Sequence, residues 1–140
     1  MAKKILVTDD DPGSLRLMAY ALQHEGYEVV TATNGRDGLK KAFKEKPDLV
    51  ILDVMLPGID GFEVCHRLRA EPETARLPVL MLSAKVQETD RATGLRVGAN
   101  DYLTKPWNRA ELMAKIAAML AGKGDDLPSG QAQGEESGRR

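Results

Sequence analysis

The sequence contains a single cysteine, Cys65, so no internal disulfide can form, and this usage is typical of the reducing cytosol. A charge imbalance is also missing. The formal net charge of -1 gives no electrostatic reason to expect direct binding to nucleic acid or to a membrane. The apolar stretch that follows Lys4 is too short for a signal peptide or a membrane span. We therefore expect a cytoplasmic protein without either kind of direct partner.

Phosphate-binding loops are missing as well. No Gly-x-Gly-x-x-Gly follows the first apolar stretch and no Gly-Lys-Ser/Thr occurs, which argues against a nucleotide-binding or flavin-binding protein. What is present is an ordinary globular composition, with 42% hydrophobic and 29% charged residues in 140 positions. The composition changes after Leu120, where glycines and mixed charges replace the apolar pattern. We assign residues 1–121 to one domain and residues 122–140 to a disordered tail or an interdomain linker.

Strand-like and helix-like patterns alternate five times along the domain. The apolar, strand-like runs span residues 4–9, 27–32, 49–53, 77–83 and 100–104. Helical patterns follow each of them, and they begin near residues 12, 34, 60, 86 and 108. This order predicts an α/β fold with a doubly wound parallel sheet and helices on both of its faces. Ligands in such folds bind beyond the carboxyl ends of the strands.

Polar side chains stand at the carboxyl ends of four of these strands. Asp9 and Asp10 end the first strand, and Asp53 ends the third, which is apolar throughout and reads as buried on both faces. Ser83 ends the fourth strand, and Lys105 follows the fifth. Because the carboxyl ends of parallel strands share one edge of the sheet, we expect these five residues to converge. Their sequence separation is large, so only the fold brings them together.

Three carboxylates that converge need a proton or a cation. At about 4 Å and an effective dielectric constant near 20, each like-charge pair costs roughly 4 kcal/mol. Hard oxygen ligands favour Mg²⁺, which binds one or two carboxylates together with phosphate oxygens. With the ammonium of Lys105 and the hydroxyl of Ser83, these are the groups that phosphoryl transfer needs, and Asp53 can act as the nucleophile that forms an acyl phosphate.

The chain resembles the response-regulator receiver domain of two-component signalling over roughly residues 3–120. Four sequence blocks carry the resemblance, and only together are they specific: Leu6-Val-Thr-Asp9-Asp10-Asp11-Pro12, Asp48-Leu-Val-Ile-Leu-Asp53-Val-Met-Leu-Pro57-Gly58-Ile-Asp60-Gly61, Leu82-Ser83-Ala84 and Gly98-Ala-Asn-Asp-Tyr102-Leu-Thr-Lys105-Pro106. The resemblance implies the flavodoxin-like, CheY-like (βα)5 sandwich of three layers, with a five-stranded parallel sheet of order 2-1-3-4-5.

The resemblance also implies a metal site and an acceptor. Asp53 would accept a phosphoryl group from a sensor histidine kinase or a phosphotransfer protein. Asp10, Asp53 and the backbone carbonyl of Met55 would bind Mg²⁺, with Mn²⁺ as an alternative, and Asp9 would act mainly through metal-bound water. Asp11 precedes Pro12, so a helix N-cap role is favoured for it over a metal role.

The remaining implied roles concern the phosphoryl group and the output. Ser83 and Lys105 would hold the phosphoryl group, and Tyr102 would switch inward as Ser83 shifts. A surface spanning about residues 86–120 would then change its affinity for an output partner that the sequence does not identify. The domain would be a signalling switch that catalyses only its own phosphorylation and dephosphorylation. Homodimer formation is left open, and a cis peptide bond is implied at Lys105-Pro106.

Other interpretations remain beside this one. Each acid could be an ordinary solvated or capping residue, Tyr102 could be a half-buried aromatic, and Trp107 could either pack against the core or contact a partner. A phosphatase that forms an aspartyl phosphate would usually need a second acid two residues after the nucleophile, but that position is Met55. A pseudo-receiver that only binds partners is the main alternative; it would have lost one of the acceptor-site residues, and all are present.

Overall fold

The computed structural model describes residues 2–84, 93 and 96–122. The strands are β1 Lys4–Thr8, β2 Glu28–Ala32, β3 Leu49–Asp53, β4 Val79–Ser83 and β5 Asp101–Thr104, and the described helices are α1 Pro12–His24, α2 Gly35–Glu45, α3 Gly61–Ala70 and α5 Arg109–Ala121. Most of the helix predicted for residues 86–97 lies outside the described residues, although residues 93, 96 and 97 have helical conformation. The predicted tail or linker from residue 123 onward lies outside them as well.

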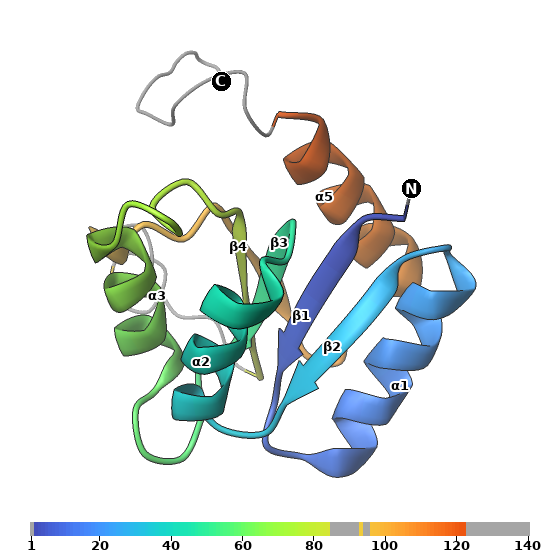
Figure 1. Cartoon of the computed structure of the whole chain (residues 1–140). Helices are drawn as coiled ribbons and strands as arrows, with labels where there is room; N and C mark the ends of the chain where they lie inside the picture. The colour runs from blue at the N-terminus through green and yellow to red at the C-terminus, as the bar shows by residue number, and fades with distance from the viewer. Residues whose placement is uncertain (1, 85–92, 94–95, 123–140) are drawn as a thin grey trace.

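The five strands form one parallel sheet of order β2-β1-β3-β4-β5, which confirms the predicted fold class and strand order. Helices α1 and α5 cover one face of the sheet, and α2 and α3 cover the other (Figure 1). The fourth strand begins at Val79 rather than at the predicted Leu77. Pro78 stands between them and has no backbone N–H to donate to a neighbouring strand.

The sheet separates two hydrophobic cores, because successive residues of a strand point to opposite faces. In β3, Val50 and Leu52 pack with the α2 and α3 side, whereas Leu49 and Ile51 pack with the α1 and α5 side. All side chains of β3 are buried, as predicted from its uninterrupted apolar run. Trp107 packs in part against the core on the α1 and α5 side, which confirms a packing role for it.

Four helices begin at a polar side chain that accepts a backbone hydrogen bond, as the sequence predicted. Asp11 accepts from Ser14, Asn34 from Asp37, Asp60 from Glu63 and Asn108 from Glu111, each at 2.8–3.0 Å. Asp11 therefore caps α1, and its side chain is used at the helix rather than in the acidic cluster. The helix α1 ends just before Gly26, whose φ of 98° only glycine adopts readily.

An arginine lies at the edge of the sheet where the strands begin, opposite the acidic cluster. The guanidinium of Arg69, in the last turn of α3, donates to the carbonyl of Gly98 at 2.7 Å and to that of Leu77 at 2.6 Å. It also donates to the side chain of Asn100 at 2.9 Å and to the carbonyl of Thr74 at 3.4 Å. A Cβ at Gly98 would lie 2.8 Å from Nε of Arg69, so only glycine fits there. Arg69 thus ties the end of α3 to the segments that precede β4 and β5.

No helix in the described part of the chain has the length and apolar character needed to cross a membrane.

Candidate functional site

The carboxyl ends of the strands lie side by side, as the parallel register requires. Asp53 of β3 is level with Leu82 of β4, and Ser83 is level with Thr104 of β5. The backbone N–H of Lys105 donates to the carbonyl of Ser83 at 2.7 Å, which fixes the point where the lysine leaves the sheet. The predicted convergence of strand-end residues at this edge is therefore seen in the backbone itself.

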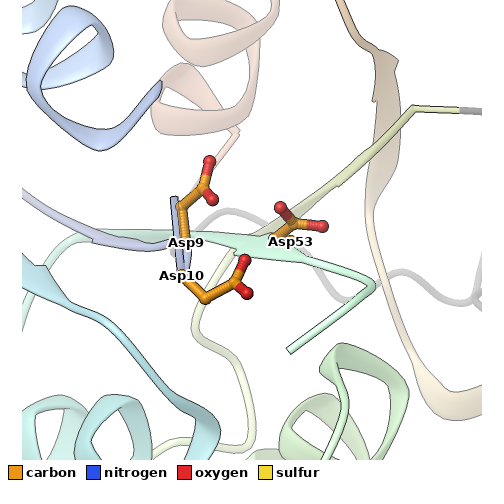
Figure 2. Close-up of side chains that lie close together, drawn as sticks. All are labelled: Asp9, Asp10 and Asp53. Atoms are coloured by element: carbon orange, nitrogen blue, oxygen red, sulfur yellow. The ribbon is translucent and has the colours of Figure 1, made fainter. Parts of the chain in front are cut away.

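Three carboxylates form a cluster at this edge. Asp9, Asp10 and Asp53 each offer a carboxylate oxygen, and these oxygens lie within 4.8 Å of one another. Figure 2 shows the side chains of Asp10 and Asp53 projecting into the same space from neighbouring strand ends. Asp9 and Asp53 are only 1% and 4% exposed, whereas Asp10 is exposed to solvent. The cluster therefore has two buried carboxylates and one that opens it to water.

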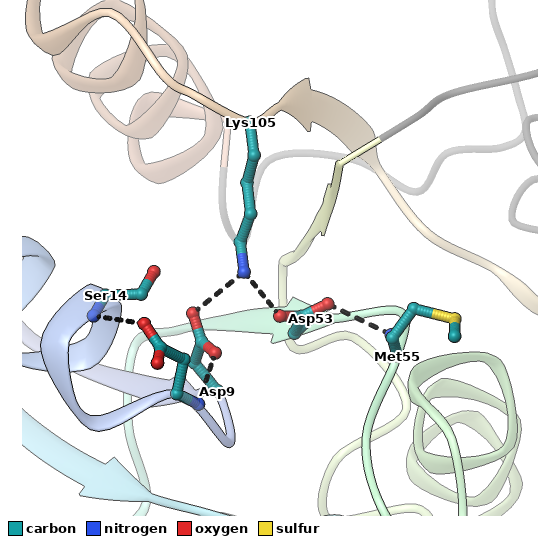
Figure 3. Close-up of polar contacts among 6 residues, drawn as sticks. Asp9, Ser14, Asp53, Met55 and Lys105 are labelled. Atoms are coloured by element: carbon teal, nitrogen blue, oxygen red, sulfur yellow. Dashed lines mark hydrogen bonds and ion pairs between the residues drawn. The ribbon is translucent and has the colours of Figure 1, made fainter.

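The ammonium of Lys105 lies between the two buried carboxylates (Figure 3). Its Nζ is 2.7 Å from Oδ2 of Asp53 and 3.2 Å from Oδ2 of Asp9. The sequence predicted a lysine near the acids but gave no sign that it would pair with both. The Lys105-Pro106 peptide bond is cis, as the resemblance implied. One ammonium between two buried carboxylates, with Asp10 beside them, leaves a surplus of negative charge that a further cation can neutralise.

The backbone after Asp53 holds the other oxygen of its carboxylate. Oδ1 of Asp53 accepts a hydrogen bond from the backbone N–H of Met55 at 3.0 Å. Met55 is 74% exposed, so its side chain projects away from the protein beside Asp53. The first residue of α3 lies against this turn: a Cβ at Gly61 would lie 2.4 Å from the carbonyl oxygen of Asp53. Only glycine at this position lets α3 begin so close to the end of β3.

The two buried carboxyls differ in their pKa. Burial raises the pKa of Asp53 above its ordinary value, although hydrogen bonds from Lys105 and Met55 oppose this effect. Burial acts on Asp9 in the same direction, but bonds from the Asp11 backbone, the Ser14 side chain and Lys105 outweigh it, so the pKa of Asp9 is lowered. Burial alone would lower the pKa of Lys105, yet its contacts with Asp53 and Asp9 raise it. Lys105 is therefore a permanent ammonium at physiological pH.

Ser83 and Tyr102, for which the resemblance implies site roles, lie in the neighbouring strands β4 and β5. Ser83 is buried at the end of β4, next along the strand from Leu82, which is level with Asp53. Tyr102 is 4% exposed and belongs to the core on the α2 and α3 side, so its ring is buried rather than half-buried. Tyr102 is level with Met81 of β4, two positions before Ser83. The pairing of β4 with β5 therefore connects Ser83 to Tyr102 through the backbone.

The sequence did not single out Ser14, which stands in the first turn of α1 beside the site. Its side chain is one of the groups that lower the pKa of Asp9. A groove of about 750 Å³ lies beside the acidic cluster, and Ser14 and Lys105 both line it with apolar residues such as Leu17 and Trp107. The only signal in the sequence was the spacing of Ser14 three positions after the N-cap Asp11, which places its backbone at the cap.

The sequence between residues 5 and 117 matches the family of the response regulator receiver domain. The chain belongs to this family. The observations that the family accounts for are the sheet order, the acidic cluster and the lysine beside it. Receiver domains are the signalling switches of two-component systems, and the acidic cluster of this one is compatible with a metal ion.

Known proteins extend this result. The receiver domain is 46% identical over 136 residues to the alkaline phosphatase synthesis transcriptional regulatory protein PhoP of Bacillus subtilis, and the match covers 97% of this chain but 56% of that protein. A putative response regulator from Chloroflexus aurantiacus superposes with a TM-score of 0.83 at 40% identity, covering 86% of this chain and 99% of that one. The chain therefore spans about half the length of PhoP and almost all of the solved regulator.

One solved relative bears on the metal. The receiver domain of the sensor histidine kinase PA1611 from Pseudomonas aeruginosa has a magnesium ion coordinated in its active-site cleft. It is 30% identical to this chain with a TM-score of 0.81, and the match covers 86% of this chain and 99% of that one. In this receiver domain, the acidic cluster provides the hard oxygen donors that Mg²⁺ prefers, and exposed Asp10 leaves it open to water. The residues present therefore fit a divalent cation.

Proposed function

We propose that this receiver domain accepts a phosphoryl group on Asp53 from the phosphohistidine of a sensor histidine kinase or a phosphotransfer protein. A carboxylate oxygen of Asp53 attacks the phosphorus, the bond from phosphorus to the histidine nitrogen breaks, and that nitrogen leaves with the electron pair. The product is an aspartyl phosphate and a free imidazole. The observation that carries the proposal is the contact of 2.7 Å between Nζ of Lys105 and Asp53.

The residues around Asp53 have distinct tasks in this step. Lys105 places a permanent positive charge where the phosphoryl oxygens arrive, and Ser83 offers a hydroxyl at the adjacent strand end. Asp10, Asp53 and the backbone carbonyl of Met55 would hold Mg²⁺ or Mn²⁺, with Asp9 acting through bound water. The metal would neutralise the charge that builds up on the phosphoryl oxygens. Burial of Asp9 and Asp53 keeps competing water away from these contacts.

Incubation with acetyl phosphate and Mg²⁺, followed by intact mass measurement, tests the acceptor. We expect the wild-type domain to gain the mass of one phosphoryl group, and we expect EDTA or Asp53→Asn to abolish the gain. Asp60→Asn is the matched control, because asparagine caps a helix as well as aspartate does and Asp60 only caps α3. An undiminished gain in Asp53→Asn, or none in wild type, would refute the proposal and favour a pseudo-receiver.

The proposal includes an output step through Ser83 and Tyr102 to a switch face, which we define as residues 86–120. The β4–β5 register supports it, because Ser83 and Tyr102 lie on paired strands next to the acceptor. A change from 1:99 to 99:1 between two states needs about 5.5 kcal/mol of differential stabilisation. Two or three charge-assisted hydrogen bonds to a phosphoryl group supply that amount. Amide chemical shifts with a beryllofluoride mimic should change at β5 and α5; changes confined to the acidic cluster would refute the output step.

The length comparison supports a proposal about the output. PhoP of Bacillus subtilis is a transcriptional regulatory protein, and this chain spans 56% of its length. We propose that the switch face controls a partner or a further domain, with residues 122–140 as tail or linker. A cytoplasmic location belongs to the same proposal, because Cys65 is a free, buried thiol.

A further inference from the structure

The loop between β3 and α3 determines where two groups beside the acceptor lie. It spans residues 54–60. Its second residue, Met55, donates its backbone N–H to Oδ1 of Asp53 at 3.0 Å. The backbone carbonyl of Met55 is the proposed ligand of the metal. The position of this loop therefore sets one hydrogen bond of the acceptor and one ligand of the cation.

Backbone hydrogen bonds fix the base of the loop. The N–H of Val54 donates to the carbonyl of Leu82 in β4 at 2.9 Å. The carbonyl of Val54 accepts from the N–H groups of Leu56 at 3.2 Å and of Gly61 at 3.0 Å. These bonds continue the sheet by one residue and join the two ends of the loop. The second half of the loop, residues 57–60, has a support of another kind.

The start of α2 supports the second half of the loop. Ile59 is partly buried and packs against the core on the α2 and α3 side. Its backbone lies against Gly35, the first residue of α2. A Cβ at Gly35 would overlap the carbonyl oxygen of Ile59 and would lie 2.6 Å from its Cγ1. A backbone oxygen cannot turn aside as the end of a flexible side chain can, so this contact requires glycine.

Two glycines thus hold the loop at opposite ends. Gly61 lies against the carbonyl of Asp53, and Gly35 lies against that of Ile59. Gly35 also approaches α3, because its Cβ would lie 3.1 Å from Cγ2 of Val64. The loop is therefore enclosed between the starts of two helices. A shift of α2 would move Ile59 and, through the short loop, the backbone beside the acceptor.

We propose that Gly35 is a positioning residue for phosphorylation. Its lack of a side chain lets the start of α2 lie against Ile59, and this contact keeps the backbone of Met55 in place beside Asp53. This inference rests on the proposed acceptor function. It extends the site from the strand ends to α2, which supplies no side chain to the acidic cluster. Gly35 acts through the loop and not by contact with the phosphoryl group.

Nuclear magnetic resonance follows the backbone of Met55 directly. In Gly35→Ala, we expect the amide resonance of Met55 to shift and its exchange with solvent to become about 3- to 10-fold faster, because its hydrogen bond to Asp53 is weakened. The amide of Val54 should keep its wild-type exchange, since it is bonded to β4. This measurement needs neither a metal nor a phosphoryl donor.

Metal binding and phosphorylation should change with the loop. We expect Gly35→Ala to bind Mg²⁺ about 3- to 10-fold more weakly by calorimetry, and to phosphorylate from acetyl phosphate more slowly by a similar factor. Ile59→Ala removes the packing of the loop from the other side and should have the same effects. Ile59→Val keeps a branched side chain and should retain wild-type values.

Gly38→Ala is the matched control in the same helix. Its Cβ would crowd the side-chain hydroxyl of Thr8 at 2.9 Å instead of the loop. We therefore expect wild-type Mg²⁺ affinity and phosphorylation rate in this variant, whatever its temperature of unfolding. Equal changes in Gly35→Ala and Gly38→Ala would show a general displacement of α2 and would overturn the role of the contact with Ile59.

The remaining outcomes separate this inference from the acceptor function. Wild-type exchange of Met55, Mg²⁺ affinity and rate in Gly35→Ala would overturn the role of Gly35 and leave the acceptor function intact. A lower temperature of unfolding with unchanged Mg²⁺ affinity would show a purely structural glycine and would also overturn it. If Gly35→Ala does not fold, Ile59→Ala decides, and unchanged values there overturn the inference. If wild-type protein gains no phosphoryl group, the acceptor function and this inference both fail.

Discussion

The two carboxylate oxygens of Asp53 have different partners: Oδ2 lies 2.7 Å from the ammonium of Lys105, and Oδ1 accepts the backbone N–H of Met55. The carboxylate is therefore held on one side by a side-chain ammonium and on the other by a backbone N–H. A phosphoryl group at this residue meets Lys105 already in place, so little reorganisation is required. Substitutions at Lys105, Asp53, Arg69 and Gly61 test the site and the fold around it.

Lys105→Gln removes the ammonium and keeps a long polar side chain. We expect its phosphorylation rate with acetyl phosphate to fall about 10²-fold, the usual effect of losing one preorganised donor in a reacting site. Mg²⁺ should bind more tightly to the variant, because the cluster then lacks its own cation. Lys115→Gln is the control, since Lys115 pairs with Asp101 on another surface. Equal rates in the two variants would contradict the role of Lys105.

Asp53→Asn should raise the temperature of unfolding at neutral pH without Mg²⁺. The pKa of Asp53 is raised above its ordinary value of 3.8, mainly by burial. Between the pKa of the unfolded chain and the higher pKa of the folded protein, the folded protein therefore binds more protons than the unfolded chain. Stability therefore falls as the pH rises through this window, and the benefit of asparagine is lost as the pH falls below the folded pKa. Thermal unfolding from pH 7 to pH 4 checks this.

Addition of Mg²⁺ should narrow or reverse the difference in unfolding temperature between Asp53→Asn and wild type. A ligand that binds the folded state stabilises it, and wild type retains all three carboxylates whereas the variant does not. An advantage of asparagine that is the same at every pH would contradict the assignment of the raised pKa to Asp53. An equal Mg²⁺ effect on both proteins would place the metal elsewhere.

Arg69→Lys should lower the free energy of unfolding by about 2–4 kcal/mol, because an ammonium cannot replace a guanidinium that serves several carbonyls at once. Arg67→Lys is a matched control on the same helix. Arg67 is half exposed, and among the described residues it pairs only with Glu63, at 2.8 Å, so a change within about 0.5 kcal/mol is expected. Urea unfolding measures both. Similar losses of unfolding free energy in the two variants would contradict a stabilising role for the hydrogen bonds of Arg69.

Gly61→Ala should disturb the acceptor itself. The new Cβ would lie 2.4 Å from the carbonyl oxygen of Asp53, so the strand end or α3 must move, with a cost of about 1–3 kcal/mol and slower phosphorylation. Gly13→Ala makes the same change in α1, where the nearest atom is 3.7 Å away. That variant should keep or gain stability, by up to about 1 kcal/mol. Unfolding and phosphorylation of both variants provide the comparison.

The sequence predicted most of the fold, because the parallel sheet and the strand-end site follow from alternation and from the geometry of parallel strands, whereas the strand order was implied by the family resemblance. Asp9, Asp10, Asp53 and Lys105 could be placed at one edge for that reason alone. Strand limits were less accurate: β4 begins two residues late, since Pro78 cannot donate a hydrogen bond. The expected helix at residues 86–97 and the tail stay predictions, as does the switching of Tyr102.

Two features could not be predicted, and they share a physical cause. Arg69 binds backbone carbonyls, including that of Gly98 at a sequence separation of 29, and a carbonyl has no sequence signature. Lys105 pairs with both Asp9 and Asp53, and only the folded sheet sets the distance between these two carboxylates. Both contacts depend on where the backbone lies after folding. Residue types alone predicted which groups gather at the site but not how they divide their hydrogen bonds.

The sheet lies between two hydrophobic cores, and each core can therefore be redesigned separately. Side chains of β3 alternate between the layer of α2 and α3 and the layer of α1 and α5. Substitutions in one core therefore change side chains on one face of the sheet, and libraries can be built for each layer and later combined. Layers taken from different homologues could be joined into chimaeras across the sheet. The edge that carries the acidic cluster and Lys105 would be kept from a single parent.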